Sequence, residues 1–172
     1  MSAAPGSTEL LLATPEDTAA FGERVGRLLR AGDLVLLAGD LGAGKTTFTR
    51  GLADGLGVRG PVTSPTFVIA REHPSLVGGP VLVHVDAYRL GSLAEVDDLD
   101  LDTAAEEAVT VVEWGRGLVE ELAGDRLEVD LVRPHGAAPT GGGDDPEGDA
   151  PVEPRRAVVR AVGPRWAGVD LS

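Results

Sequence analysis

One octapeptide constrains the fold of this chain more than any other feature: Gly39-Asp40-Leu41-Gly42-Ala43-Gly44-Lys45-Thr46. It matches the pattern G-x-x-x-x-G-K-[ST] of a phosphate-binding loop. The apolar run at residues 34–38 precedes it, and a helix-forming run that stops at Gly57 follows it. Strand, glycine-rich loop and helix, in this order, are the context in which the pattern binds nucleotide phosphates.

Each residue type in this loop has a chemical reason. Glycine lets the backbone bend so that successive N–H groups point at phosphate oxygens, and the first turn of the helix adds further donors. We expect Lys45 to reach the outer phosphates and the Thr46 hydroxyl to hold a Mg²⁺ ion. Lys45 is the only lysine of the chain, and the other fourteen of its fifteen basic residues are arginine. A compact ammonium is thus found only where the motif requires one.

Length, composition and charge indicate how many domains the chain forms, where it is found and whether it binds nucleic acid directly. A chain of 172 residues with 42% hydrophobic residues predicts one globular domain. The absence of cysteine, of a signal region and of an apolar run long enough to span a bilayer predicts a cytoplasmic protein with no membrane contact. A net charge of −13, with no basic run longer than two residues, argues against direct, tight binding to nucleic acid. Any nucleic-acid role would be shared with a partner.

Helical and strand-like segments alternate along the chain. The stretch Thr14-Pro15-Glu16-Asp17 has the pattern of a helix start, and the helix that follows is expected to end at Gly32. Strands are predicted at residues 67–70, 81–86 and 110–113, and shorter helices at about 92–107 and 116–123.

The two last alternating segments, residues 126–133 and 155–162, are predicted to pair as a C-terminal antiparallel hairpin. Together with the alternation of strands and helices, this predicts an α/β fold of the P-loop NTPase kind. We expect a three-layer sandwich with a largely parallel central sheet.

The folded domain is expected to span residues 9–165, after a flexible N-terminus at residues 1–8. Residues 134–154 are rich in glycine, proline and acid, and their only large aliphatic residue is one valine. Because such a segment cannot offset its ordering entropy by burial, it is predicted to be a disordered acidic loop.

Two acids, Asp86 and Glu113, end neighbouring predicted strands. Ligands of parallel sheets bind at the carboxyl ends of the strands, so both acids are expected near the phosphates. Mg²⁺ prefers hard oxygen ligands, and we expect one acid to help hold it and the other to orient the attacking water. Thr66 lies in a loop that either contacts the γ-phosphate or forms a simple proline turn. His84 is expected to lie in the core or to be hydrogen-bonded.

Three other kinds of nucleotide-binding protein are alternatives to an ATPase. A GTPase would need an N-K-x-D or T-K-x-D element, which a chain without asparagine and with one lysine cannot contain. A small-molecule kinase is the strongest alternative and stays open; it would normally have an arginine-bearing lid, and residues 92–107, which hold no arginine or lysine, do not fit such a lid. A nucleotide-gated binding module, in which hydrolysis times partner release, stays open beside an ATPase.

Four motifs in this order resemble the TsaE (YjeE) family: G-D-L-G-A-G-K-T-T, S-P-T-F, H-V-D-A-Y-R-L and V-E-W. The resemblance covers about residues 10–133. It implies a small bacterial ATPase required for threonylcarbamoyl modification of adenosine 37 in tRNA. It also implies that the protein acts with the TsaB–TsaD pair, whose tRNA-modifying complex is reset by ATP turnover, and meets tRNA only through that pair. The chain departs from the family at Gly115, where proline commonly stands, and in its longer acidic loop.

The resemblance also implies roles for particular residues. Asp86 would be needed for hydrolysis, Thr66 would lie on a switch-like loop, and Mg²⁺ would be held by Thr46 and Glu113. Arg155 matches a late arginine that reaches the nucleotide. ATP would otherwise be bound by one continuous set of residues: Gly42, Ala43, Gly44, Lys45, Thr46 and Thr47.

Overall fold

A computed structural model of the chain describes residues 7–39, 43–60, 70–86, 106–113, 125–133 and 154–171. Within these residues there are two α-helices and a short 3-10 helix, together with a single sheet of seven strands. The helices are α1 (Pro15–Leu28), α2 (Lys45–Leu56) and the 3-10 helix η3 (Pro164–Trp166). The strands are β1 (Ser7–Leu12), β2 (Leu34–Gly39), β3 (Ala70–His73), β4 (Val81–Asp86), β5 (Ala108–Glu113), β6 (Arg126–Val132) and β7 (Arg155–Val162).

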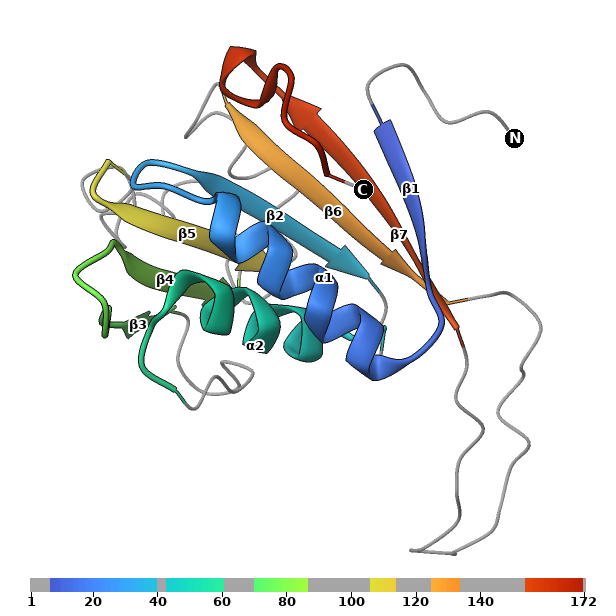
Figure 1. The fold of residues 1–172 in the computed structure, drawn as a ribbon, viewed down its shortest axis with the longest axis horizontal. Helices are drawn as coiled ribbons and strands as arrows, with labels where there is room; N and C mark the ends of the chain where they lie inside the picture. The colour runs from blue at the N-terminus through green and yellow to red at the C-terminus, as the bar shows by residue number, and fades with distance from the viewer. Residues whose placement is uncertain are drawn as a thin grey trace, which may run out of the picture.

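The strand order is β1-β7-β6-β2-β5-β4-β3 (Figure 1). The four central strands, β6, β2, β5 and β4, run parallel to one another. The outer strands are antiparallel to their neighbours: β7 to β6, β1 to β7, and β3 to β4. The sheet is therefore mixed with a parallel centre, and the two C-terminal segments expected to pair, now β6 and β7, are antiparallel neighbours.

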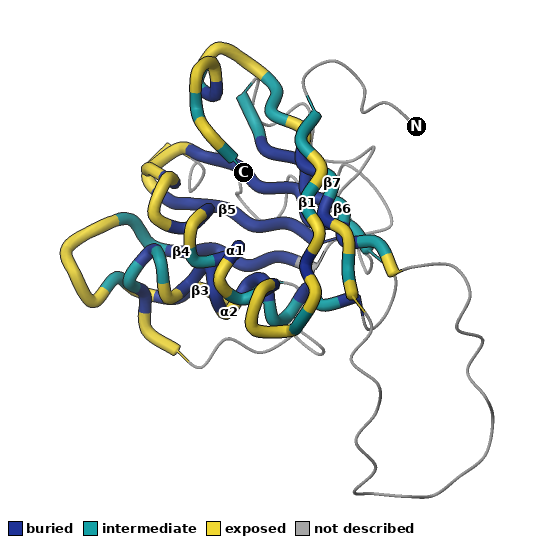
Figure 2. The backbone as a smooth tube through the Cα atoms, turned by 45° about the vertical axis from the view of Figure 1, so that its right-hand side comes forward, coloured by how far each residue is buried: buried dark blue, intermediate teal, exposed yellow. Residues whose placement is uncertain are grey.

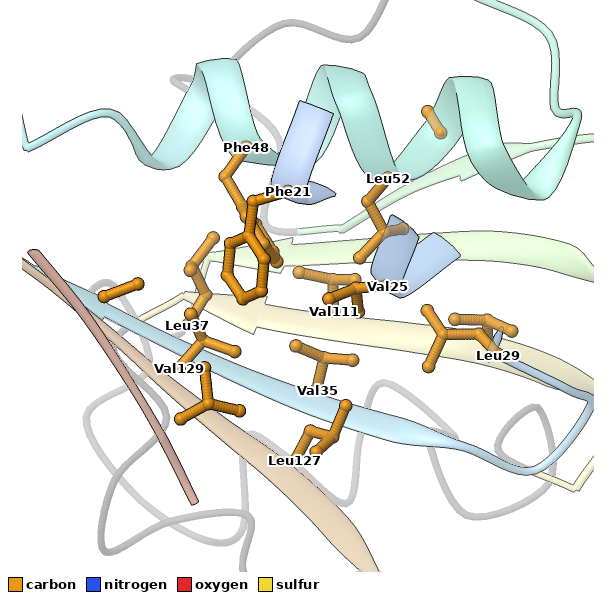
Figure 3. Packing of buried hydrophobic residues seen from close by; sticks show 14 of the residues in the cluster. Phe21, Val25, Leu29, Val35, Leu37, Phe48, Leu52, Val111, Leu127 and Val129 are labelled. Atoms are coloured by element: carbon orange, nitrogen blue, oxygen red, sulfur yellow. The ribbon is translucent and has the colours of Figure 1, made fainter. Parts of the chain in front are cut away.

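Both α-helices lie side by side on one face of the sheet (Figure 1). The main hydrophobic core fills the space between them and the strands, where the rings of Phe21 and Phe48 meet with centroids 5.5 Å apart (Figure 3). Residues of the opposite face, such as Leu36 and Val85, are also buried, and the central strands are buried along most of their length (Figure 2). No helix of the described residues covers that face. The third layer remains a prediction, because residues 92–105 and 116–123, where helices are expected, lie outside the described residues; residues 106–107, the expected end of the first of these helices, form a turn.

Helix α1 begins as its sequence predicts and ends earlier. The Thr14 hydroxyl accepts from the Asp17 N–H at 3.1 Å, and the Asp17 carboxylate accepts from the Thr14 N–H at 3.1 Å, which is a complete capping box. The helix ends at Leu28, so the prediction that it ends at Gly32 was wrong. Gly32, with φ at 93°, instead turns the chain into β2, and its N–H donates to the carbonyl of Ala108 on β5 at 2.9 Å.

The two helices touch backbone to backbone through four glycines. A Cβ atom added to any of them would lie between 2.0 and 2.2 Å from a carbonyl oxygen of the other helix, closer than real atoms approach. At this separation the glycine Cα–H groups face those carbonyls, a contact that recurs at close helix interfaces. The orientation of α2, and therefore of its N-terminus, is set by α1. The glycine–carbonyl pairs are Gly22–Phe48, Gly26–Leu52, Gly51–Ala19 and Gly55–Glu23.

The folded part of the chain is longer at both ends than predicted. Ser7 and Thr8 belong to β1 and pair with β7, so the expectation of a flexible terminus through residue 8 was wrong at these two positions. Beyond residue 165, Trp166 is buried in the core and Leu171 packs against it, so the domain continues past the expected end. Strand pairing with β7 explains the first extension, and apolar side chains that cover the core explain the second. Of the predicted loop at 134–154, residues 134–153 lie outside the described residues.

Arg165 joins three parts of the fold. Its Nε and Nη2 donate to the two carboxylate oxygens of Asp33 at 3.2 and 3.0 Å, and Nη2 also donates to the carbonyl of Leu28, the last residue of α1, at 2.8 Å. Its guanidinium carbon lies 4.3 Å from the centre of the Trp166 ring. Both charged side chains are largely buried, with 15% and 7% exposed. The C-terminal segment is therefore tied to the α1–β2 turn.

Arg165→Ala is expected to lower the free energy of unfolding by about 3 kcal/mol, because it leaves the buried carboxylate of Asp33 without its partner. Urea denaturation measures the change. Arg160→Ala is the matched control: its ion pair with Glu128 is half-exposed, and Glu128 keeps a second arginine, Arg126, at 3.0 Å. The control should cost less than about 1 kcal/mol. Equal losses for the two variants would contradict the role assigned to Arg165.

Candidate functional site

The phosphate-binding motif connects the carboxyl end of β2 to the first turn of α2. Gly39 ends the strand, residues 40–42 lie outside the described residues, and Ala43 is buried. Gly44 is the N-cap of α2 with φ at 103°, a left-handed conformation that favours glycine. The first helical bond runs from the Phe48 N–H to the Gly44 carbonyl at 2.9 Å. The three N–H groups before it, at residues 45–47, therefore point out of the helix as potential phosphate donors.

Lys45 is the first residue of α2 and the seventh residue of this motif. Its side chain is buried, with 9% of the residue exposed, and Nζ donates to the Gly39 carbonyl at 2.6 Å. This bond joins the last residue of the strand to the first residue of the helix, across the loop. A buried ammonium needs a hydrogen-bonding or charged partner. The Gly39 carbonyl is that partner here, so the cation is already in place when an anion enters the loop. Thr46 and Thr47 follow it in the first turn of α2 and are half-buried.

The two predicted acids lie next to each other. Asp86 ends β4, Glu113 ends β5, and the register of these parallel strands pairs them directly. Neighbouring strands are about 4.8 Å apart, so the two backbones are adjacent. Glu113 is also the register partner of Leu37 on β2, which places it beside the strand that carries the phosphate-binding motif, with Asp86 one strand further away. By the alternation of strands, Glu113 lies on the same face as Val111, the face covered by α2.

Glu113 is almost completely buried, with 3% exposed. Its Oε1 atom has no hydrogen-bond partner among the described residues. A buried carboxylate oxygen without a partner is uncommon, and a carboxylate is the kind of hard oxygen ligand that a divalent cation prefers. The donor set around the phosphate end, the Thr46 hydroxyl and the Glu113 carboxylate, consists of oxygen atoms and thus fits Mg²⁺.

His84 lies on β4, on the same face as the core residue Leu82, two residues after it. As predicted, it is in the core, and it is fully buried. It is not hydrogen-bonded: neither ring nitrogen has a partner among the described residues, and Nε2 lies 3.6 Å from Oε1 of Glu113. This contact was not predicted, and the sequence holds no local signal for it, because it joins side chains of two different strands.

The remaining predicted residues are less fully placed. Arg155 begins β7, and because β7 runs antiparallel to β6, it lies at the edge of the sheet where β2 and β6 end. Arg155 and Ala157 are two residues apart in the strand and therefore lie on the same face. Because Ala157 is a core residue, this is the face covered by the helices. Thr66 and Gly42 lie outside the described residues. Within the part of the chain that the structure describes, no helix is long and apolar enough to cross a membrane.

Comparisons with known proteins agree on one family. A family profile described as "Threonylcarbamoyl adenosine biosynthesis protein TsaE" matches residues 12–138. The tRNA threonylcarbamoyladenosine biosynthesis protein TsaE of Streptomyces coelicolor is 58% identical over 153 residues, which are 88% of this chain and 95% of that protein. The protein of the same name from Bacillus subtilis is 42% identical over 120 residues, covering 69% of this chain and 73% of the relative. The crystal structure of Bacillus subtilis YdiB is similar with a TM-score of 0.65 and 32% identity, covering 93% of this chain and 88% of that one.

Proposed function

Because the chain belongs to the TsaE family, which acts in tRNA threonylcarbamoyladenosine biosynthesis, we propose that it is a Mg²⁺-dependent ATPase serving that modification as an accessory factor. One observation carries the proposal: the buried lysine of the phosphate-binding motif is held at the carboxyl end of β2, and the next two strands, β5 and β4, end in the paired acids Glu113 and Asp86. ATP is the substrate, and the products are ADP and phosphate.

The chain's own groups would bind and activate the phosphates. The N–H groups of residues 45–47 and the positive end of the α2 dipole face the phosphate oxygens. Lys45 would exchange the Gly39 carbonyl for an oxygen of the outer phosphates and neutralise the charge that develops on the transferring phosphoryl group. Arg155, at the same edge of the sheet, would contact the nucleotide.

Thr46 and Glu113 would hold the magnesium ion. When bound, Mg²⁺ supplies charge neutralisation at the β- and γ-phosphate oxygens. Asp86, the neighbour of Glu113, would accept a hydrogen bond from the attacking water and so orient it toward the γ-phosphate. Thr66 would lie on the loop that senses the γ-phosphate.

The net charge of −13 supports an indirect role in tRNA modification. A strongly acidic protein repels the phosphate backbone, so we propose that it meets tRNA only through the TsaB–TsaD pair and that ATP turnover resets that complex. The site of action would be the cytoplasm, where tRNA is modified.

The variant Asp86→Ala tests the division of labour at the site. We expect it to keep its affinity for Mg·ATP within about threefold and to release phosphate about a hundredfold more slowly, because the water loses its orienting group. Binding of a fluorescent ATP analogue and a phosphate-release assay measure the two quantities. Asp54→Ala, which removes an exposed acid of α2, is the control and should match the wild type in both.

The same assay separates hydrolysis from transfer. Equal amounts of ADP and inorganic phosphate are expected from an ATPase. ADP formed without inorganic phosphate, and only when a small acceptor is added, would show a kinase and overturn the proposed activity.

A further inference from the structure

Three buried polar atoms without partners meet at the end of β4 and β5. They are Nδ1 and Nε2 of His84 and Oε1 of Glu113, and among the described residues none of them makes a hydrogen bond. The two side chains are 0% and 4% exposed, and Nε2 and Oε1 are 3.6 Å apart. We propose that His84 is a positioning residue, whose imidazole orients the carboxylate of Glu113 toward the metal. The inference rests on the proposed function, in which Glu113 is a magnesium ligand.

The separation of the two atoms is close to a hydrogen bond. A shift of about 0.6 Å brings an N–H donor and a carboxylate oxygen into the usual range of 2.7–3.2 Å. A carboxylate only accepts, so Nε2 is the nitrogen that carries the proton toward it. Occupying Oε1 in this way leaves the second oxygen of Glu113 for the cation. Carboxylates that bind metals are themselves commonly held by such outer hydrogen bonds.

Among the described residues, the neighbours of His84 in the sheet offer it no polar partner other than Glu113. Its register partner on β5 is Val111, and its same-face neighbour on β4 toward the far end of the sheet is Leu82, both fully buried and apolar. On its other side, the register partner on β3 is Arg71, which is exposed. If the imidazole served packing alone, an aliphatic side chain could fill the same space without the free-energy cost of burying polar atoms.

His73 provides a matched comparison within the same sheet. It is also buried, with 6% exposed, and its Nε2 also lacks a partner among the described residues. Its Nδ1, however, lies 3.1 Å from the Arg59 carbonyl. It pairs with Leu82, four residues before Asp86, and so lies about 13 Å from the phosphate end of the sheet. Removing this imidazole changes the core without touching the site.

The experiment measures magnesium affinity without turnover. The full-length protein is saturated with a non-hydrolysable ATP analogue and titrated with Mg²⁺ in a calorimeter, and the unfolding temperature of each variant is recorded. We expect His84→Leu to weaken Mg²⁺ binding about tenfold and to leave the metal-free affinity for the analogue unchanged. His84→Gln, whose amide N–H₂ can donate from a similar position, should restore most of the Mg²⁺ affinity. His73→Leu should lower the unfolding temperature without weakening Mg²⁺ binding.

The variant Glu113→Gln distinguishes a failure of the positioning role of His84 from a failure of the metal role of Glu113. If Glu113→Gln weakens Mg²⁺ binding and His84→Leu does not, the positioning role is wrong and the metal ligand stands. If Glu113→Gln has no effect either, the metal role of Glu113 fails, and the inference fails with it. Should His84→Leu not fold, His84→Gln is compared with His84→Asn, whose shorter side chain cannot reach Oε1. Equal Mg²⁺ affinities of these two variants would overturn the inference.

Discussion

Replacing Lys45 with alanine is expected to lower phosphate release from Mg·ATP by at least about a hundredfold and to weaken nucleotide binding. The chain has no other lysine, and the Lys45 ammonium is buried within the motif, at 2.6 Å from the Gly39 carbonyl. Alanine removes the one cation that lies between the two ends of the loop. Phosphate release and binding of a fluorescent ATP analogue measure the two effects.

The control for this variant is Arg59→Ala, which removes an exposed cation that follows the C-terminal end of α2, the end remote from the motif. It should release phosphate at the wild-type rate. Turnover that is unchanged in Lys45→Ala would remove the nucleotide site from the phosphate-binding motif and contradict the proposed activity.

The second large effect is expected at Gly51, in the middle of α2. Gly51→Ala should lower the free energy of unfolding by about 3 kcal/mol or more, because its Cβ would lie 2.0 Å from the carbonyl oxygen of Ala19 and would force the helices apart. The bulkier Gly51→Val is expected not to fold, since a domain of this kind has only about 5–15 kcal/mol in total. Urea denaturation and the unfolding temperature measure the loss.

Whether Gly51→Ala lowers or raises the stability of the protein tests the backbone contact between α1 and α2. In an exposed helix, replacing glycine with alanine stabilises by about 1 kcal/mol, so stabilisation by Gly51→Ala would contradict the backbone contact between α1 and α2. Gly79→Ala is the control, because an added Cβ there meets only side-chain atoms at 3.5 Å or more. It should change stability by less than about 0.5 kcal/mol. Gly51→Ala should also weaken ATP binding, since α2 carries the phosphate donors at its N-terminus.

Where a local signal exists, the fold could be predicted from the sequence. The capping box at Thr14, the strand before the phosphate-binding motif and the apolar runs that became β4 and β5 all rest on patterns within a few residues. Strand β1 was missed because its first residues are small and polar. They are ordered by pairing with β7, about 150 residues further along the chain. Such pairing is a tertiary effect that local propensity does not contain.

In the site too, features that rest on local sequence patterns could be predicted, and features that rest on tertiary contacts could not. The motif and the strand-end positions were enough to predict that Lys45, Asp86 and Glu113 lie at the same end of the sheet. The register of β2, β4 and β5 places the two acids there, and the bond to the Gly39 carbonyl places the lysine there. The contact between His84 and Glu113 depends on side-chain conformations across two strands, so spacing alone could not predict it. The role of Thr66 and the disorder of the acidic loop remain predictions.

The glycine contacts between α1 and α2 did leave a signal. Gly22 and Gly26, like Gly51 and Gly55, are four residues apart and therefore share a helix face. Four small residues arranged in this way on consecutive helices indicate a close approach of the two backbones. The partner carbonyls could not be named in advance, because they depend on how the helices are offset along their axes.

The most direct test of the central claim is phosphate release from Mg·ATP, measured for the wild-type protein alone and with the purified TsaB–TsaD pair. Lys45→Ala under both conditions reports any contaminating activity. The account predicts slow release by the protein alone, a clear rise when the pair is added, and no release above background from the variant. Release that does not respond to the pair, together with ADP formation triggered by a small acceptor, would contradict it and identify a kinase.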